Sequence, residues 1–263
     1  MKINYTQKKI AENLQILEED QKAGRVVQTS LLPEKDLQFG EYVISHSVTP
    51  SLYLSGDFVE YFYITDTKVG FYLADVSGHG ASSAFVTVLL KSLISNCNAR
   101  YQVHGDKTIF NPEHIMEELS CDIHAAKLGK YMTMIYGVID LETNELKYGV
   151  GGHYPNPILI GADGVSKYLE GSGFPVGIMS SATYKAYTTE IPVGGSLVLF
   201  SDGIMEIFLA GQEMVVKDKS LLETVSKANA DIPLLIQAIG LDKTMEHQPD
   251  DITMLVVKRK AKA

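Results

Sequence analysis

The first 32 residues carry a pattern that predicts a helix. One seam position recurs every seven residues and is mostly apolar, at Ile3, Ile10, Leu17, Gly24 and Leu31. The companion seam positions are mostly polar, so two interpretations stay open: a dimerising or signal-relaying stalk, or a helix packed on the protein's own core. Pro33 predicts the end of this helix, because proline cannot continue the helical hydrogen-bond ladder. We therefore expect a helical linker at 1–32 and a single domain at 33–263.

From residue 40 onward, short runs rich in Val, Ile, Tyr and Phe predict strands instead. Strands are expected at 41–48, 58–65, 68–76, 131–141, 145–152, 157–161, 165–170, 183–191, 196–202 and 251–259. Helices are expected at 78–96, 112–128, 218–230 and 232–246. This order of strands, two helices, strands, two helices and a last strand predicts an α+β sandwich in which helices cover antiparallel sheets.

The helix expected at 78–96 has an apolar stripe at helical spacing. Phe85, Val88, Leu89 and Leu93 share that stripe, so we expect them to form the buried face of the helix. Pro112 should open the following helix, because proline is favoured in the first helical turn.

Charge and composition narrow the class of partner. The net charge is -9, from 32 acidic and 23 basic residues, so the surface repels nucleic acids and anionic membranes. No apolar run approaches the ~18 residues of a membrane span, and the N-terminus reads polar, so we expect neither a membrane helix nor a secretory signal. Cys97 and Cys121 fit no zinc or redox spacing. We expect both to be small core residues of a cytoplasmic protein.

Four aspartates share one local setting at the ends of predicted strands. They stand beside glycine or another polar residue, at Asp57, Asp75, Asp202 and Asp250. Each Asp-Gly pair alone is typical of an ordinary turn. Together, carboxylates that gather at the ends of buried strands need positive charge between them, and hard oxygen ligands suit Mg²⁺ or Mn²⁺. Zinc is disfavoured because the histidines form no metal-binding pair. His79 lies in a glycine-rich turn, where a histidine more often caps or packs than binds metal, and it stays a candidate donor near the acids.

Six motifs then follow one another in a recognisable order: SGDF, ADVSGHG, GGHYPNPILI, GFPVGI, LVLFSDGIMEI and DDITMLVV. Over roughly residues 25–258 the chain resembles the SpoIIE/RsbU branch of the metal-dependent protein phosphatases, the bacterial relatives of type-2C phosphatases. The resemblance implies a four-layer α-β-β-α sandwich with two central, mainly antiparallel sheets and a site for two Mn²⁺ or Mg²⁺ ions at one end.

The resemblance also implies roles for individual residues. Asp75 would bridge both ions, the Val76 carbonyl would complete the first ion, and Asp202 and Asp250 would hold the second. Asp57 would be a further ligand or would orient water, which makes these four aspartates the expected catalytic set. Residues expected around the ligands are Asp251, Glu206, His79 and Glu60.

The function implied by the resemblance is dephosphorylation of phosphoserine or phosphothreonine on an anti-sigma-factor antagonist, in a bacterial partner-switching pathway. Water held by the two cations would attack phosphorus directly. An upstream sensor or receiver domain would act through residues 1–32, and this segment could also join two copies into a homodimer. Two alternatives remain: a catalytically degenerate binding module of the same fold, and a two-metal nucleotide cyclase.

Overall fold

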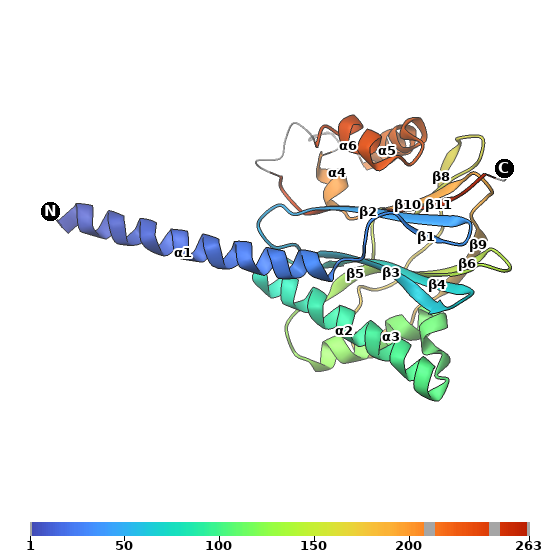
Figure 1. Ribbon diagram of the computed structural model, residues 1–263, viewed down its shortest axis with the longest axis horizontal. Helices are drawn as coiled ribbons and strands as arrows, with labels where there is room; N and C mark the ends of the chain where they lie inside the picture. The colour runs from blue at the N-terminus through green and yellow to red at the C-terminus, as the bar shows by residue number, and fades with distance from the viewer. Residues whose placement is uncertain (1, 208–213, 242–247, 262–263) are drawn as a thin grey trace.

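A computed structural model describes residues 2–207, 214–241 and 248–261 of the chain (Figure 1). Two β-sheets are stacked face to face, helices cover the outer face of each sheet, and a long helix projects from one end. The predicted four-layer α-β-β-α sandwich is therefore confirmed.

The first sheet, sheet A, contains six strands in the order β1-β2-β11-β10-β7-β8, and all its pairings are antiparallel. Its strands are short except for β2 and β11, which form the long centre of the sheet. Their bounds are β1 Leu37–Phe39, β2 Tyr42–Thr49, β7 Ile158–Ile160, β8 Ser166–Tyr168, β10 Ser196–Phe200 and β11 Ile252–Arg259.

The second sheet, sheet B, contains five strands in the order β3-β4-β5-β6-β9, again all antiparallel. Three of its strands are nine residues long and lie side by side at the centre and edge of the sheet. The bounds are β3 Asp57–Thr65, β4 Lys68–Val76, β5 Met132–Asp140, β6 Glu145–Gly151 and β9 Ala186–Glu190.

Three apolar cores separate the four layers. Helices α2 (Ala81–His104) and α3 (Pro112–Ala125), with the short 3-10 helix η1 (Lys107–Phe110), cover sheet B. Helices α4 (Gly203–Ile207), α5 (Met214–Ala228) and α6 (Ile232–Ala238) lie on sheet A. Alternate side chains of both sheets fill the space between them, as the two-residue period of a strand requires.

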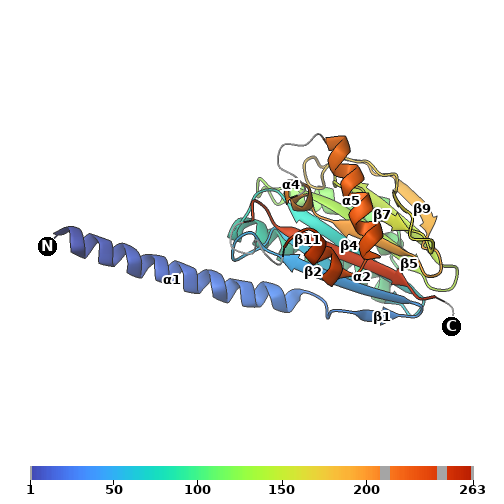
Figure 2. The same ribbon diagram turned by 90° about the horizontal axis from the view of Figure 1, so that it is seen from above.

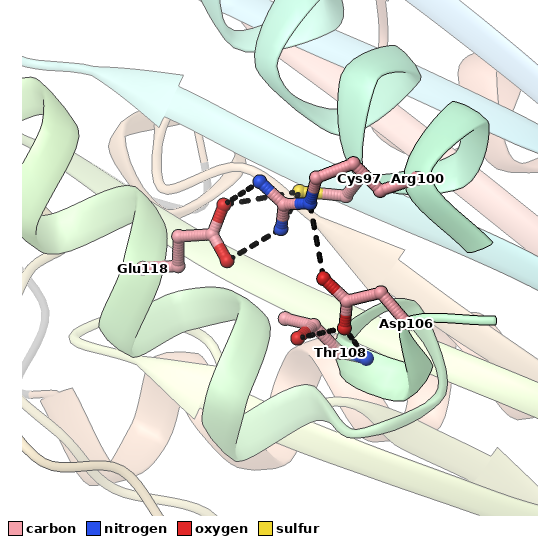
Figure 3. A network of polar contacts seen from close by, with 5 residues as sticks. All are labelled: Cys97, Arg100, Asp106, Thr108 and Glu118. Atoms are coloured by element: carbon pink, nitrogen blue, oxygen red, sulfur yellow. Dashed lines mark hydrogen bonds and ion pairs between the residues drawn. The ribbon is translucent and has the colours of Figure 1, made fainter. Parts of the chain in front are cut away.

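Polar contacts hold the helical layer over sheet B together (Figure 3). The Arg100 guanidinium on α2 pairs with Glu118 on α3 and with Asp106 before η1, at 2.6 and 3.0 Å. Asp106 also accepts a hydrogen bond from the Thr108 backbone, which caps η1. The buried thiol of Cys97 lies against this group, as expected for a core cysteine, whereas Cys121 is exposed, so its prediction as a core residue is wrong.

Helix α1 (Lys2–Leu31) confirms that the N-terminal segment is helical, and it extends well beyond the sandwich (Figures 1 and 2). Its middle part exposes the apolar side chains of Ile10, Leu14 and Leu17 by 54%, 60% and 57%. Near its C-terminal end Gln28 is buried, and its side chain donates to the Ser55 carbonyl at 2.7 Å. One helix thus combines a free apolar stripe with a docked end.

The prediction for the buried face of α2 is wrong at two positions. Phe85 and Val88 are 74% and 41% exposed, and the fully buried stripe is instead Val86, Leu90 and Ile94. This helix is apolar on several sides, so its spacing could not decide which side meets the sheet. Helix α4 was also not predicted, because five residues are too short to give a periodic pattern.

The C-terminal helical prediction at 232–246 is confirmed only as far as Ala238 in α6, and residues 242–247 lie outside the described part of the chain. Within the described residues, no helix combines the length and the apolar character that crossing a membrane requires.

Candidate metal centre

Sheet B brings three site residues into one row. In the register of the hairpin β3–β4, Asp57 lies directly opposite Asp75, and in the next pairing Asp75 lies opposite Thr133 of β5. Side chains that face each other across neighbouring antiparallel strands are about 5 Å apart at Cβ and lie on the same face of the sheet. The three side chains therefore stand together at one end of sheet B, on the face that meets sheet A.

Sheet A supplies the other aspartates at the same end of the sandwich. Strand β10 ends at Phe200, two residues before Asp202, and β11 begins at Ile252, directly after the Asp250-Asp251 pair. Because β10 and β11 are antiparallel, the end of one strand lies beside the start of the other. In both views α4, which begins at Gly203, lies at the end of the sandwich from which α1 projects (Figures 1 and 2).

Asp251 ties the two sheets together at this end. It is 4% exposed, and its carboxylate accepts hydrogen bonds from the Ser51 and Gly56 backbone amides at 2.7 Å each. The hydroxyls of Ser51 and Ser55 add bonds of 2.9 and 3.0 Å. Four donors therefore hold this carboxylate, which fixes the loop 51–56 before Asp57.

The aspartates open into a hollow of about 540 Å³. Asp75, Asp202 and Asp250 line it, and the Asp57 carboxylate is buried behind them. Among the described residues, neither lysine nor arginine lines this hollow; the other lining side chains are hydroxyls, amides, an imidazole and apolar groups, at Ser51, Leu52, Ser77, His79, Tyr131, Thr133, Gln248 and Pro249.

Crowding of carboxylates raises their pKa values. Removal from water, and then the charges of Asp202 and Asp250, raise the pKa of Asp75 from 3.8 to about 8. Complete burial, and then the charge of Asp75, raise the pKa of Asp57 well above its ordinary value. Partial desolvation, and then Asp250, also raise the pKa of Asp202, although its side chain reaches solvent. These groups cannot all be ionised at neutral pH without a nearby positive charge.

The donor set fits a divalent cation. Asp57 Oδ2 is buried and has no partner at hydrogen-bond distance among the described residues. The hydroxyls of Thr253 and Ser201 lie near enough to offset part of the rise in its pKa, but they supply no charge. A buried acceptor of this kind needs a compensating partner. Oxygen donors are what Mg²⁺ and Mn²⁺ prefer.

The acidic side chains of the hollow do not stand at the distances of a bound metal ion. Within the described part of the chain, no three His, Cys, Asp or Glu side chains stand at metal-ligand spacing. Asp75 and Asp202 instead lie within reach of a shared hydrogen bond, which favours the protonated form of Asp75 and offsets part of the net rise in the pKa of Asp202. This is the arrangement expected of like-charged groups that share a proton.

Two glycines allow the backbone to close tightly around the acids. A side chain at Gly56 would bring its Cβ within 2.9 Å of the Val76 carbonyl oxygen. A side chain at Gly203 would bring its Cβ within 2.1 Å of the Asp251 carbonyl. Glycine beside each acid is therefore required by backbone contact, and it keeps the Val76 carbonyl beside the Asp57 segment.

Thr133 is held by a buried histidine. The His153 ring is 4% exposed, and its Nε2 lies 2.7 Å from the Phe200 carbonyl, which can only accept. Nε2 therefore carries the proton, and Nδ1 accepts from the Thr133 hydroxyl at 2.9 Å. Burial lowers the pKa of His153 to about 4, so the ring is neutral at physiological pH. As a result, Thr133 directs only oxygen lone pairs toward the hollow.

The remaining predicted residues fall in different places. Glu206 on α4 lies close enough to Asp202 for its charge to raise the pKa of that carboxyl. His79 is exposed on the wall of the hollow. Glu60 stands on the opposite face of β3, where its carboxylate accepts from the Tyr72 hydroxyl at 2.8 Å and pairs with Lys91.

Sequence reasoning missed the uncharged lining residues, above all Thr133 and Tyr131. Neither belongs to a motif with a characteristic spacing, and Thr133 joins the site only through its position opposite Asp75. The one available signal was the predicted strand pairing, but a sequence alone leaves the register of two strands open by one residue.

Comparison with known proteins places the chain in a family. The model of the family described as stage II sporulation protein E (SpoIIE) matches residues 65–260. Protein IcfG of Synechocystis sp. is 26% identical over 90% of this chain, which spans 41% of that protein. The phosphoserine phosphatase RsbU of Bacillus subtilis is also 26% identical, over 89% of this chain and 68% of its own length.

Solved structures share the fold. The SiaA-PP2C domain of Pseudomonas aeruginosa superposes with a TM-score of 0.74 at 19% identity, over 94% of this chain and 98% of that domain. RsbX, solved in complex with magnesium, gives a TM-score of 0.57 at 17% identity, over 82% of this chain and 94% of its own. Because the family match covers residues 65–260, which is well over half of the sequence, the chain belongs to the SpoIIE family.

Proposed function

We propose that this chain is a metal-dependent protein serine/threonine phosphatase that works with two Mn²⁺ or Mg²⁺ ions. One observation carries the proposal: aspartates from both sheets meet in one hollow, their pKa values are raised, and the described lining residues include neither lysine nor arginine. A relative named as a phosphoserine phosphatase and a related fold solved with magnesium support the same conclusion.

The residues that would hold the ions are the acids of the hollow. Asp75 would serve both ions, the Val76 carbonyl would join it at one, and Asp202 and Asp250 would serve the other. The orphaned Oδ2 of Asp57 would act as a further ligand or orient water. When bound, the cations would supply an activated water as nucleophile and neutralise charge on the phosphoryl oxygens.

The protein's own side chains would position the reactants. Thr133 donates its hydroxyl hydrogen to His153, so its oxygen can accept a hydrogen from the attacking water. Tyr131 lies on the lining of the hollow, where its hydroxyl can donate to a phosphoryl oxygen. Glu206 and His79 lie near these groups, whereas Glu60 is engaged elsewhere and is not part of the proposed set.

The substrate and partners follow from the family. We propose that the substrate is a phosphorylated anti-sigma-factor antagonist in a partner-switching pathway, and that an upstream sensor or receiver domain acts through α1. The exposed stripe of Ile10, Leu14 and Leu17 suits pairing with the same helix of a second copy. The boundary of the linker at residue 32 and the cytoplasmic location stay predictions.

The direct test is hydrolysis of an aryl phosphate and of a phosphoserine peptide, with Mn²⁺ and with a chelator. We expect turnover only with metal, and its loss in Asp75→Asn and Asp202→Asn, which should keep the wild-type circular dichroism spectrum. Turnover in the chelator, or full activity in either variant, would contradict the proposal. Tight metal binding without any turnover would favour a degenerate binding module of the same fold.

A further inference from the structure

A second hollow adjoins the proposed metal centre. It has a volume of about 460 Å³ and lies between the C-terminal end of α3, the loop that follows it, and the turn at 177–178. Tyr131 lines both this hollow and the one that contains the aspartates, so the two are neighbours. We call it the docking hollow; its walls include three large apolar and three basic side chains, at Leu128, Tyr131, Ile178, His124, Lys127 and Lys130.

Three apolar side chains of the docking hollow are exposed to solvent. Leu128, Tyr131 and Ile178 are 51%, 41% and 43% exposed. A cluster of exposed apolar side chains beside a functional site is typical of an interaction surface. The docking hollow therefore has the character of a contact site for another molecule.

Hydrogen bonds hold the backbone behind these side chains. Val176 and Met132 exchange backbone bonds of 2.9 and 2.7 Å, which attach the 176–178 turn to the start of β5. The Ser120 hydroxyl accepts from the Gly177 amide at 3.0 Å and donates to the Met179 carbonyl at 2.8 Å. The exposed apolar side chains thus stand on an anchored framework, which lowers the entropy lost when a partner binds.

The docking hollow is locally basic in a protein whose net charge is -9. Neither Lys127 nor Lys130 forms an ion pair with a described residue. The Lys130 ammonium instead donates to the Ser77 carbonyl at 2.7 Å and to the Ser83 hydroxyl at 3.1 Å, on the rim of the aspartate hollow. The docking hollow would attract a phosphorylated, acidic segment, whereas the net negative charge of the protein repels such a segment elsewhere.

We propose that the docking hollow binds the stretch of a substrate protein that flanks its phosphoserine, with an apolar side chain inside the hollow and an acidic side chain against Lys127. This inference rests on the proposed phosphatase function, because the hollow would hold the flanking chain while the phosphoserine enters the metal centre. It assigns part of the substrate specificity to the loop 125–131 and to the 176–178 turn.

The test compares phosphoserine peptides that differ only in their flanks. One set carries a Leu-Asp pair at successive positions on either side of the phosphoserine, and the reference peptide carries Ser-Gly instead; p-nitrophenyl phosphate reports on the metal centre alone. We expect one placement of the pair to lower KM about tenfold, as partial burial of one leucine would do. Leu128→Glu and Lys127→Glu should abolish that preference and leave p-nitrophenyl phosphate hydrolysis unchanged.

Matched controls separate docking from a general effect of charge. Leu234→Glu alters an equally exposed leucine on α6, and Lys167→Glu alters an exposed lysine on β8, both on the sheet A side of the molecule. These controls should keep the peptide preference. Preference for no placement, or a preference that survives in Leu128→Glu, would overturn the docking hollow while p-nitrophenyl phosphate hydrolysis still supports the phosphatase.

Two further outcomes are decisive. Hydrolysis of none of the substrates by the wild-type protein would overturn the proposed function, and this inference with it. A change of oligomeric state in Leu128→Glu, measured by light scattering, would assign the hollow to contact with a second copy of the chain and overturn its role in substrate binding.

Discussion

Replacing Asp57 with asparagine exchanges a buried ionisable carboxyl, whose pKa is raised by burial, for a neutral amide of the same size. In the metal-free protein, Asp57 Oδ2 has no hydrogen-bond partner among the described residues and lies opposite Asp75. An asparagine amide there can donate to Asp75, so Asp57→Asn should make the metal-free protein more stable, at the expense of metal binding.

The magnitude follows from the contact that is repaired. A buried unsatisfied acceptor costs about 1–3 kcal/mol, so we expect a gain of about 2 kcal/mol in the free energy of unfolding. For a domain of this size, that corresponds to a rise in Tm of about 4–8 °C. The wild-type protein, in contrast, should gain about 2.7 kcal/mol when the metal is present at a hundred times its Kd.

The assay is thermal unfolding in a chelator and in Mn²⁺, at neutral pH. Asp66→Asn is the matched control, because Asp66 is exposed in the turn at the other end of the same hairpin. We expect Asp57→Asn to unfold at a higher temperature than the wild type in the chelator and to respond less to Mn²⁺. A lower Tm in the chelator, or an undiminished response to Mn²⁺, would refute the reasoning.

Three further predictions concern neighbouring groups. Asp251→Ala should lower the free energy of unfolding by about 3–5 kcal/mol in denaturant titrations, because four buried or half-buried donors lose their acceptor. A loss below 1 kcal/mol would contradict the conclusion that Asp251 joins the two sheets. Thr133→Val should lower kcat about 10- to 100-fold while calorimetric Mn²⁺ affinity stays unchanged, and Thr133→Ser should restore kcat; wild-type kcat in Thr133→Val would contradict the acceptor role. In a chelator, Tm should fall as the pH rises from about 4 toward 8, because the folded state keeps a proton on Asp75 that the unfolded state releases. Mn²⁺ should reduce that dependence, and a Tm that rises through this interval would disprove the pKa assignment.

The positions of the principal acids could be predicted because the signal is local. Asp57, Asp75 and Asp202 follow or begin short apolar runs, with a glycine adjacent or three residues away, and this pattern identifies strand ends. The ends of antiparallel strands from two stacked sheets must meet at one of two edges, so their convergence needs no exact register. The convergence of these aspartates at one end of the sandwich can therefore be predicted from the sequence.

The features of the site that could not be predicted from the sequence depend on the register between strands and on the face to which each side chain points. Thr133 enters the site because it lies opposite Asp75. His153, which follows β6 of the same sheet, bonds Thr133 and also reaches Phe200 of sheet A. Asp251 was expected merely near the ligands, whereas the structure gives it four hydrogen bonds that join the sheets. Such contacts depend on residues distant in sequence, which no local pattern encodes.

Glu60 shows the limit of transferring a motif without geometry. It follows Asp57 by three positions on the same strand, and successive side chains of a strand point to opposite faces. Asp57 therefore faces sheet A, whereas Glu60 faces α2 and its Lys91. The face of α2 was likewise misassigned, because apolar residues surround that helix on most sides.

The central claim is that aspartates from two sheets share divalent cations at one end of the sandwich. The most direct measurement is anomalous diffraction at the manganese edge from crystals grown with Mn²⁺. Two anomalous peaks in the hollow, in contact with the carboxylates of Asp75, Asp202 and Asp250, are the predicted result. Well-defined electron density for these three side chains, with no anomalous peak between them, would contradict the account.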